Sequence, residues 1–304
     1  MTSLDNNTKV KKRDWSVWIF LLPTILLLGF WVYKPLIQTV IYAFYSWNMI
    51  PGTLPEYVGL ENFANFFSNP EFKQAMGNTF YYIITLLPFS VVLPLIVSAL
   101  IQDVEPKFRT FYRVIIFMPM IMPPVVNAII FQWLFHQTNG LVNYVLVSLG
   151  IFESGKNFFM DPIWARRIIT LITGWKMFAY SSIIYSGSIG MISNDYYEAA
   201  EMDRASKLKQ FLKITVPMLS PQIMLMLMMS VLFASQWTFN YVESLTAGGP
   251  YGSTTNFYYL IYKNAFLNSN IGASAASSLV FLLLFGTISL LLLRMSKKLS
   301  FYDN

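Results

Sequence analysis

The sequence has no cysteine, one histidine, and charged side chains at only 12% of its 304 residues. Without cysteine the chain has no disulfide framework, no thiol nucleophile and no cysteine-ligated metal. His136 has no second histidine or cysteine with which to bind a metal, so we interpret it as a side chain at a membrane interface. A soluble domain carries about 25% charged residues. The deficit therefore favours a membrane protein and predicts neither a catalytic nor a metal site.

Long apolar runs occupy most of the chain, and 55% of the residues are hydrophobic. A helix needs about 20 apolar residues to cross the hydrocarbon core of a bilayer. Six segments meet this requirement, so we expect an all-α integral membrane protein with six transmembrane helices. The first runs from Trp15 to Leu36 and is expected to continue toward Trp47; the others are 78–102, 114–135, 168–192, 214–242 and 264–293.

The connecting segments carry Lys and Arg unevenly, with fourteen on one side of the predicted membrane and five on the other. Cytoplasmic loops hold the excess of positive charge. Both termini and the loop 194–213 are therefore expected in the cytoplasm. The net charge of +6 follows from this topology, and we predict no nucleic-acid partner.

This orientation divides the chain into five parts. They are a cytoplasmic tail (1–14), a first transmembrane helix (15–47), an extracytoplasmic loop (48–77), a five-helix core (78–295) and a second cytoplasmic tail (296–304). In the extracytoplasmic loop, Phe63, Phe66 and Phe67 fall at helical spacing. This spacing predicts a short amphipathic helix on the outer face of the membrane.

The predicted spans contain almost no ionisable residue. Lys176 and Glu243 are the nearest candidates, and both are expected toward a span end. Secondary carriers and proton pumps depend on such groups deep in the membrane. A self-sufficient carrier or channel is therefore the weaker alternative, and a membrane enzyme lacks a catalytic cluster. The transport energy is expected to come from a separate motor.

The segment 195–221 is the longest polar interruption in the second half of the chain. Asn194 or Asp195 is expected to cap a short helix with Glu198 in its first turn, and Ser206 is expected to cap a second one. A solvated loop would contain the same residue types. The apolar stripe of the second helix favours instead an element that docks on a soluble partner.

Glu198, Ala199 and Ala200 are followed at fixed distances by Ile214 and Pro217. This pattern resembles the EAA motif in permease subunits of binding-protein-dependent ABC importers. The family pattern has glycine where Arg204 stands and leucine where Val216 stands. The loop "TAGGPYGSTTN" and the six-span layout are similar to the carbohydrate-uptake branch, which includes maltose-type and glycerol-phosphate-type permeases.

The resemblance implies the type I importer fold and a non-catalytic subunit in a bacterial cytoplasmic membrane. It also implies a second homologous permease, two copies of a cytoplasmic ATPase and an extracytoplasmic solute-binding protein. ATP and Mg would be bound by the ATPase, so this chain needs no cofactor. The residues expected to dock the ATPase are Glu198, Ala199, Ala200, Asp203 and Arg204.

Arg204 is the main departure from the family pattern. Glycine adopts a positive φ without steric cost, whereas arginine would be strained by about 1 kcal/mol. Either this turn has ordinary dihedral angles, or Arg204 makes a compensating contact with an acidic group of the ATPase.

A polar and aromatic stretch in the fifth predicted span is the candidate substrate path. Aromatic rings stack on sugar rings, and amides bond to hydroxyl groups. An interfacial aromatic belt would contain the same residues. The expected substrate is a sugar or oligosaccharide, with a glycerol-phosphate-type or other polar solute as the alternative. The path residues are Gln236, Trp237, Thr238, Asn240 and Tyr241.

Overall fold

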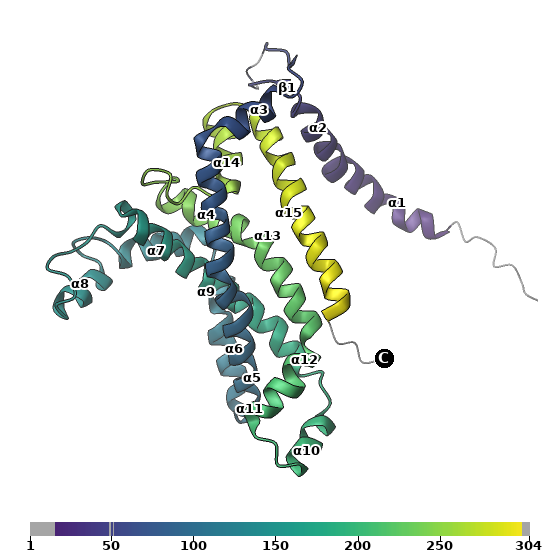
Figure 1. The fold of residues 1–304 in the computed structure, drawn as a ribbon, viewed down its shortest axis with the longest axis vertical. Helices are drawn as coiled ribbons and strands as arrows, with labels where there is room; N and C mark the ends of the chain where they lie inside the picture. Colours follow the sequence, from purple (N-terminus) through teal and green to yellow (C-terminus); the bar gives the residue numbers. More distant parts are fainter. Residues whose placement is uncertain (1–15, 49, 51, 300–304) are drawn as a thin grey trace, which may run out of the picture.

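The computed structural model describes residues 16–48, 50 and 52–299. The predicted tail 1–14 and residues 300–304 lie outside the described part. Within it, five helical segments are long and apolar enough to cross a membrane, and one sharply bent pair of helices adds a sixth. The predicted all-α membrane architecture is confirmed. Figure 1 shows a bundle with a short hairpin at one end and α10 at the other.

Five of the spans in the described part of the chain are unbroken helical segments, and two of these five contain a π-helical turn. Each π-helical turn joins two α-helices without ending the span. The first span consists of α1 (Ser16–Leu28), a π turn at 29–33 and α2 (Lys34–Tyr42); the second consists of α4 (Pro70–Leu87), a π turn at 88–92 and α5 (Leu93–Gln102). Three single helices complete the set: α9 (Pro162–Ile189), α13 (Ser220–Leu245) and α15 (Ile271–Leu299).

The first helix continues beyond Leu36, as expected, but it ends at Tyr42 and does not reach Trp47. The chain instead enters a two-stranded hairpin, in which β1 (Tyr45–Ser46) pairs antiparallel with β2 (Glu56–Tyr57). The rings of Tyr45 and Tyr57 meet edge to face with their centroids 5.4 Å apart. Such cross-strand aromatic pairs stabilise a hairpin.

The third span is broken rather than straight. Its halves, α6 (Pro106–Ile121) and α7 (Pro124–Leu134), meet at 95°. A residue that precedes proline is pushed out of the helical region, and Met122 and Pro123 both have extended ψ angles, of 128° and 138°. The single span predicted over 114–135 is therefore corrected to two half-helices. α6 packs on α9, and α7 packs on α13.

α13 lies at the centre of the bundle and contacts α4, α7, α9 and α15. The core that these helices share is built from large apolar side chains, among them Tyr82, Leu86, Ile172 and Phe257. The hydroxyl of Ser230 on α13 donates to the hydroxyl of Ser90, with 2.6 Å between the oxygens. Polar contacts of this kind hold helices together inside a membrane.

Shorter helices connect the spans. α3 (Glu61–Ser68) occupies the predicted amphipathic segment; its Phe66 is buried against Phe72 and Phe257, while Phe67 is exposed. The remaining elements are α8 (Leu141–Ser148), a 3-10 turn (Phe158–Met160), α10 (Asn194–Met202), α11 (Lys207–Gln210), a π turn (Phe211–Thr215), α12 (Val216–Met218), α14 (Phe257–Tyr262) and a π turn (Lys263–Leu267).

Candidate functional site: the α10 end and the exposed face of α13

α10 begins one residue earlier than the sequence predicts. Ser193 is its N-cap, and its hydroxyl accepts a hydrogen bond from the backbone N–H of Asp195 at 3.3 Å. The expectation that Asn194 or Asp195 caps this helix is therefore wrong. Ser193 has extended backbone angles, as an N-cap residue requires, whereas Asn194 is already the first helical residue.

α10 ends in a turn that uses a left-handed residue. The N–H of Arg204 donates to the carbonyl of Glu201, and the N–H of Ala205 donates to the carbonyl of Ala200, both at 2.9 Å. This pair of bonds is a Schellman motif, which places its C′ residue in the left-handed region. Arg204 has a φ of +54°. The alternative of ordinary dihedral angles at Arg204 is therefore wrong.

The segment after this turn is fixed by side-chain hydrogen bonds. Ser206 accepts from the N–H of Lys209 at 3.3 Å, which confirms the predicted cap of the second helix. The side chain of Gln210 is buried and donates to the carbonyl of Ala205 at 3.1 Å. α11 is thus held against the turn that ends α10.

α10 is tied to the bundle by two further contacts. The hydroxyl groups of Tyr197 and Thr215 lie 2.9 Å apart and share a hydrogen bond. Lys207 forms ion pairs with Glu201 on α10 at 3.0 Å and with Asp103, after α5, at 3.9 Å. The hydrogen bond to Glu201 raises the pKa of the Lys207 ammonium group. Both contacts link α10 to the ends of spans.

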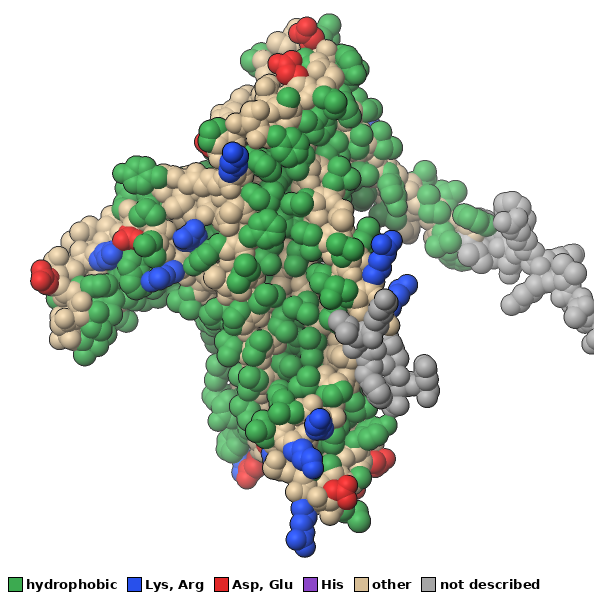
Figure 2. All heavy atoms as spheres, in the orientation of Figure 1, with side chains coloured by type: hydrophobic (Ala, Val, Ile, Leu, Met, Phe, Trp, Pro, Cys, Tyr) green, Lys and Arg blue, Asp and Glu red, His purple; other side chains and the backbone are tan. Residues whose placement is uncertain are grey.

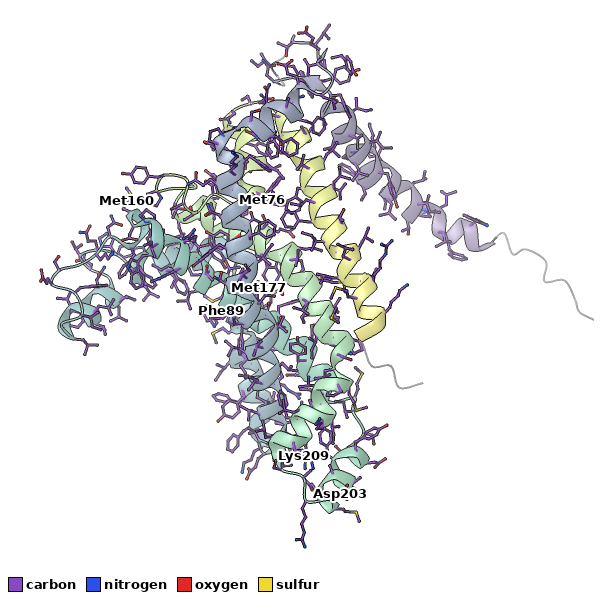
Figure 3. The ribbon with its side chains drawn as sticks, in the orientation of Figure 1. Met76, Phe89, Met160, Met177, Asp203 and Lys209 are labelled. Atoms are coloured by element: carbon purple, nitrogen blue, oxygen red, sulfur yellow. The ribbon has the colours of Figure 1, made fainter. Side chains whose placement is uncertain are left out.

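The predicted docking residues all lie at the tip of the molecule. Glu198, Ala199, Asp203 and Arg204 are exposed, and Ala200 is half-buried. Charged side chains gather at this end, which Figure 2 shows at the bottom, and Figure 3 labels Asp203 there. The two small side chains Ala199 and Ala200 thus form an alanine face on α10, with charged side chains on either side of it.

Three of the five predicted path residues lie on one face of α13. Gln236 is exposed, whereas Trp237 and Asn240 are half-buried. The Trp237 ring stacks on that of Phe233, with the centroids 4.7 Å apart and 10° between the planes. The ring of Tyr180 on α9 meets both edge to face. Together they form an aromatic cluster beside an exposed amide.

In the described part of the chain, one cation lies beside this cluster. The Nζ atom of Lys176 lies 5.8 Å from the centroid of the Trp237 ring. Lys176 is fourteen residues after Pro162 and thirteen before Ile189, so it lies at the middle of α9 and not toward an end, as the sequence suggested. A lysine at this depth is a functional-site candidate by default.

The other two predicted path residues, Thr238 and Tyr241, are fully buried inside the bundle. The hydroxyl of Thr238 accepts a hydrogen bond from the amide of Asn256 at 2.6 Å. Asn256 also donates to the carbonyl of Ser235 at 2.9 Å, which fixes the glycine-rich loop to α13. Thr238 and Tyr241 therefore lie behind the exposed face of α13 and do not line the candidate path.

The exposed face of α13 continues outward to a cavity of about 530 Å³. Glu243 lines it and lies seven residues after Gln236, on the same side of the helix. It is close to the end of α13 at Leu245, as expected. One of its carboxylate oxygens accepts from the hydroxyl of Tyr262 at 3.4 Å.

Phe233, Tyr180 and the Tyr197 link to Thr215 were not predicted from the sequence. The sequence does indicate each pair separately. Phe233 and Trp237 are four residues apart, as are Lys176 and Tyr180, and this spacing places the members of each pair on one helix face. The contact between the two pairs depends on how α9 packs against α13, and no local pattern reveals it.

The chain is similar to known transport proteins. A family model described as the binding-protein-dependent transport system inner membrane component matches residues 102–299. The sulfoquinovosyl glycerol transport system permease protein of Agrobacterium fabrum is 31% identical over 260 residues, which cover 85% of this chain and 83% of that protein. The sn-glycerol-3-phosphate transport system permease protein of Pectobacterium atrosepticum is 28% identical over 282 residues, which cover 92% and 94%.

The fold is also similar to a solved structure. A chain in the crystal structure of a bacterial ABC transporter involved in the import of the acidic polysaccharide alginate superposes with a TM-score of 0.84 at 25% identity. The superposition covers 95% of the present chain and 98% of that chain. The residues matched by the family model include α9, α10 and α13.

Proposed function

The chain belongs to the family of binding-protein-dependent transport system inner membrane components and is a non-catalytic permease subunit of an ABC importer, and from this premise we propose how it works. α10 docks a cytoplasmic ATPase, the α9–α13 face forms half of the path of a sugar or oligosaccharide, and both termini are cytoplasmic. Two ATPase copies, a second homologous permease and a solute-binding protein complete the importer.

The docking proposal rests on one observation, the exposed alanine face of α10 above a turn held by two backbone hydrogen bonds. Small side chains let a helix enter a cleft on another protein, and Glu198 at the rim offers a charge for pairing. Arg204 is held at a positive φ, and its guanidinium group has no ion-pair or hydrogen-bond partner among the described residues. We therefore assign it a contact with an acidic group of the ATPase.

The links between α10 and the spans give docking a mechanical consequence. Because Tyr197 is bonded to Thr215, a displacement of α10 pulls on the π-helical turn that leads into α13. Lys207 connects the same helix to the loop after α5 through Glu201 and Asp103. Closure of two docked ATPases would thus reach the helix that carries the path residues.

The path proposal is supported by the side chains on the exposed face. The rings of Trp237 and Phe233 offer a flat surface for a sugar ring, and the amides of Gln236 and Asn240 offer hydrogen bonds to hydroxyl groups. The transport systems of two similar proteins are named for sulfoquinovosyl glycerol and alginate. Both the side chains on the exposed face and the names of these transport systems support a sugar or oligosaccharide as the substrate.

Lys176 favours a second candidate, an anionic solute. Its ammonium group lies beside Trp237 at the middle of α9, and it has no acidic partner among the described residues. A phosphate or carboxylate on the solute would neutralise it. A glycerol-phosphate-type compound or an acidic saccharide would satisfy this requirement.

A charge reversal tests the docking proposal. The Glu198→Lys variant is expected to lose co-purification with the ATPase while it inserts into the membrane at the wild-type level. Glu56→Lys carries the same reversal at the hairpin, at the opposite end of the molecule, and should keep the ATPase. Normal co-purification and uptake by the Glu198→Lys variant would contradict the docking assignment.

Uptake by the reconstituted importer tests the path. The Trp237→Ala variant is expected to raise the KM for sugar uptake, because it removes the stacking surface. Lys176→Gln separates the two solute classes: it should abolish uptake of a phosphorylated or acidic solute and spare a neutral sugar. Unchanged kinetics in the Trp237→Ala variant would place the path elsewhere.

A further inference from the structure

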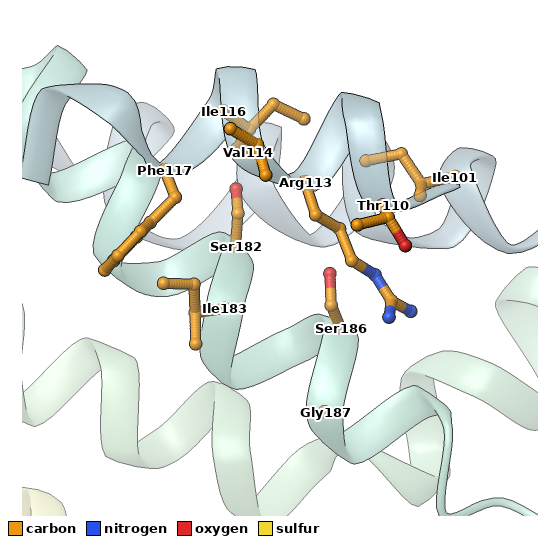
Figure 4. Close-up of a pocket in the computed structure, with 10 residues that line it drawn as sticks. All are labelled: Ile101, Thr110, Arg113, Val114, Ile116, Phe117, Ser182, Ile183, Ser186 and Gly187. Carbon is orange, nitrogen blue, oxygen red and sulfur yellow. The ribbon is translucent and has the colours of Figure 1, made fainter. Parts of the chain in front are cut away.

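A cavity of about 380 Å³ lies between α6 and α9, near the α10 end of the bundle. Figure 4 shows Arg113 projecting from α6 into the space above Ser186 of α9, with Thr110 beside it and Ser182 one turn earlier on α9. The remaining lining is mostly apolar and includes Phe117. The cavity thus has a basic, hydroxyl-rich end and an apolar end.

Arg113 differs from Arg109, one turn earlier on the same helix. Arg109 donates to the carbonyl of Gln102, the last residue of α5, and to that of Val104, two residues later. The exposed side chain of Arg113 makes no ion pair or hydrogen bond among the described residues. Arg109 has a structural explanation within the chain, whereas the guanidinium group of Arg113 has free donors.

The hydroxyl groups in the cavity are free as well. Serine and threonine hydroxyls inside helices commonly bond to the carbonyl four residues earlier, as Ser188 does to Ile184 at 2.9 Å. Ser182 is buried, and its hydroxyl oxygen has no partner in the described structure. The hydroxyls of Thr110 and Ser186 also form no bond among the described residues. Several uncommitted donors therefore surround one space.

The position of the cavity relates it to the bilayer. Arg113 is seven residues after Pro106, which is about 10 Å along α6. A basic side chain at this distance from a helix end can reach the headgroup level while its stem remains in the apolar layer. In Figure 4 the Arg113 side chain extends from α6 into the groove, and its guanidinium group lies near Ser186 on the side of Thr110.

We propose that this cavity binds an anionic phospholipid, with the phosphodiester on Arg113 and the cavity hydroxyls and an acyl chain along Phe117 and Ile183. The planar guanidinium group matches two phosphate oxygens at once. No carboxylate lines the cavity in the described structure, so nothing there receives the cationic part of a zwitterionic headgroup. A glycerol headgroup, which has no cation, fits this lining better.

Native mass spectrometry of the delipidated full-length chain tests the proposal. Phosphatidylglycerol and phosphatidylcholine with identical acyl chains are added stepwise, and the bound fraction of each is measured. The wild type is expected to prefer phosphatidylglycerol. Arg113→Gln should weaken its binding about tenfold or more, because bonds to a charged group are lost. Arg113→Lys should restore part of the preference.

Two further variants separate this site from general charge effects and from misfolding. Lys107→Gln removes an exposed cation from the same helix and should leave the lipid preference unchanged. Ser182→Ala combined with Ser186→Ala keeps all charges and should reduce phosphatidylglycerol binding severalfold. Elution of each variant at the same volume as the wild type in size-exclusion chromatography verifies folding.

Two results would overturn the proposal. One is an equal preference for phosphatidylglycerol in the wild type and in both the Arg113→Gln and the double serine variants. The other is complete displacement of the lipid by millimolar glycerol phosphate, which would show that the site takes a soluble phosphate. Retention of phosphatidylglycerol in the presence of glycerol phosphate supports the lipid.

Discussion

Replacing Arg204 by glycine removes a Cβ atom from a residue with a φ of +54°. A non-glycine residue in the left-handed region costs about 1–2 kcal/mol. Glycine loses more backbone entropy on folding, which costs about 0.5–1 kcal/mol. The difference is a net stabilisation of the turn by about 0.5–1 kcal/mol. The equilibrium for local opening should therefore fall about two- to fivefold.

Hydrogen–deuterium exchange of peptides that span 194–206 measures this change where it occurs. The amide protons of Arg204 and Ala205 are bonded to the carbonyls of Glu201 and Ala200. In the Arg204→Gly variant we expect the amides at 204 and 205 to exchange about two- to fivefold more slowly, in proportion to the reduced opening. The effect is local, so the global unfolding temperature should change little.

Arg204→Ala is the matched control, because it removes the charge and keeps the Cβ atom. It should exchange at close to the wild-type rate. Equal slowing in the alanine and glycine variants would refute the reasoning, since the effect would then follow from the charge. Faster exchange in the glycine variant would show that the turn does not store backbone strain. ATPase stimulation in the assembled importer, measured with both variants, reports the proposed contact separately.

Three further changes have defined outcomes in thermal unfolding of the purified chain. Asp161→Ala should lower the free energy of unfolding by about 1 kcal/mol at neutral pH, because the carboxylate caps α9. The hydrogen bond from Lys156 lowers the pKa of this carboxyl, so the stability difference between the wild type and the variant should persist above pH 3.8, the ordinary pKa, and should be lost as the pH falls through the lowered pKa. A stability difference that does not change with pH would contradict this assignment. Asn256→Ala should cost about 1–3 kcal/mol by leaving buried groups unpaired, whereas an unchanged midpoint would show that they find other partners. Gly272→Ala should cost about 1–3 kcal/mol, because its Cβ would lie 2.1 Å from the carbonyl oxygen of Tyr45, and normal stability would mean that the hairpin is free to move.

The spans were predictable because a high average hydropathy marks a membrane helix, but the residues at which the helices begin and end were harder to predict. α4 begins at Pro70, eight residues before the predicted start at Asn78, because its first turns are polar. The signal for the true start was present, since Asn69 caps the helix and proline suits the first helical position. A run of apolar residues locates the part of a helix that lies in the membrane core, but it does not locate the ends of the helix.

The candidate sites divide in the same way. The position of α10 was predictable because its residues are contiguous in the sequence. The positive φ of Arg204 was one of two alternatives, and the two backbone hydrogen bonds of the turn decide between them. The path residues were only partly predictable. Thr238 and Gln236 are two residues apart, yet one is buried and the other exposed. Which face of α13 is open depends on its packing against α4 and α9, and a helix that is apolar on most sides does not encode this locally.

The first helix has a consequence for biogenesis. From Phe20 to Tyr42 the span buries none of its residues in the rest of the chain, and burial begins at Ala43, which packs on Ala275 and Ala276 of α15. This helix is synthesised before α15, because its attachment point lies more than two hundred residues later in the chain. It must therefore partition into lipid as an independent unit, and its docking on α15 belongs to a second, later stage of assembly.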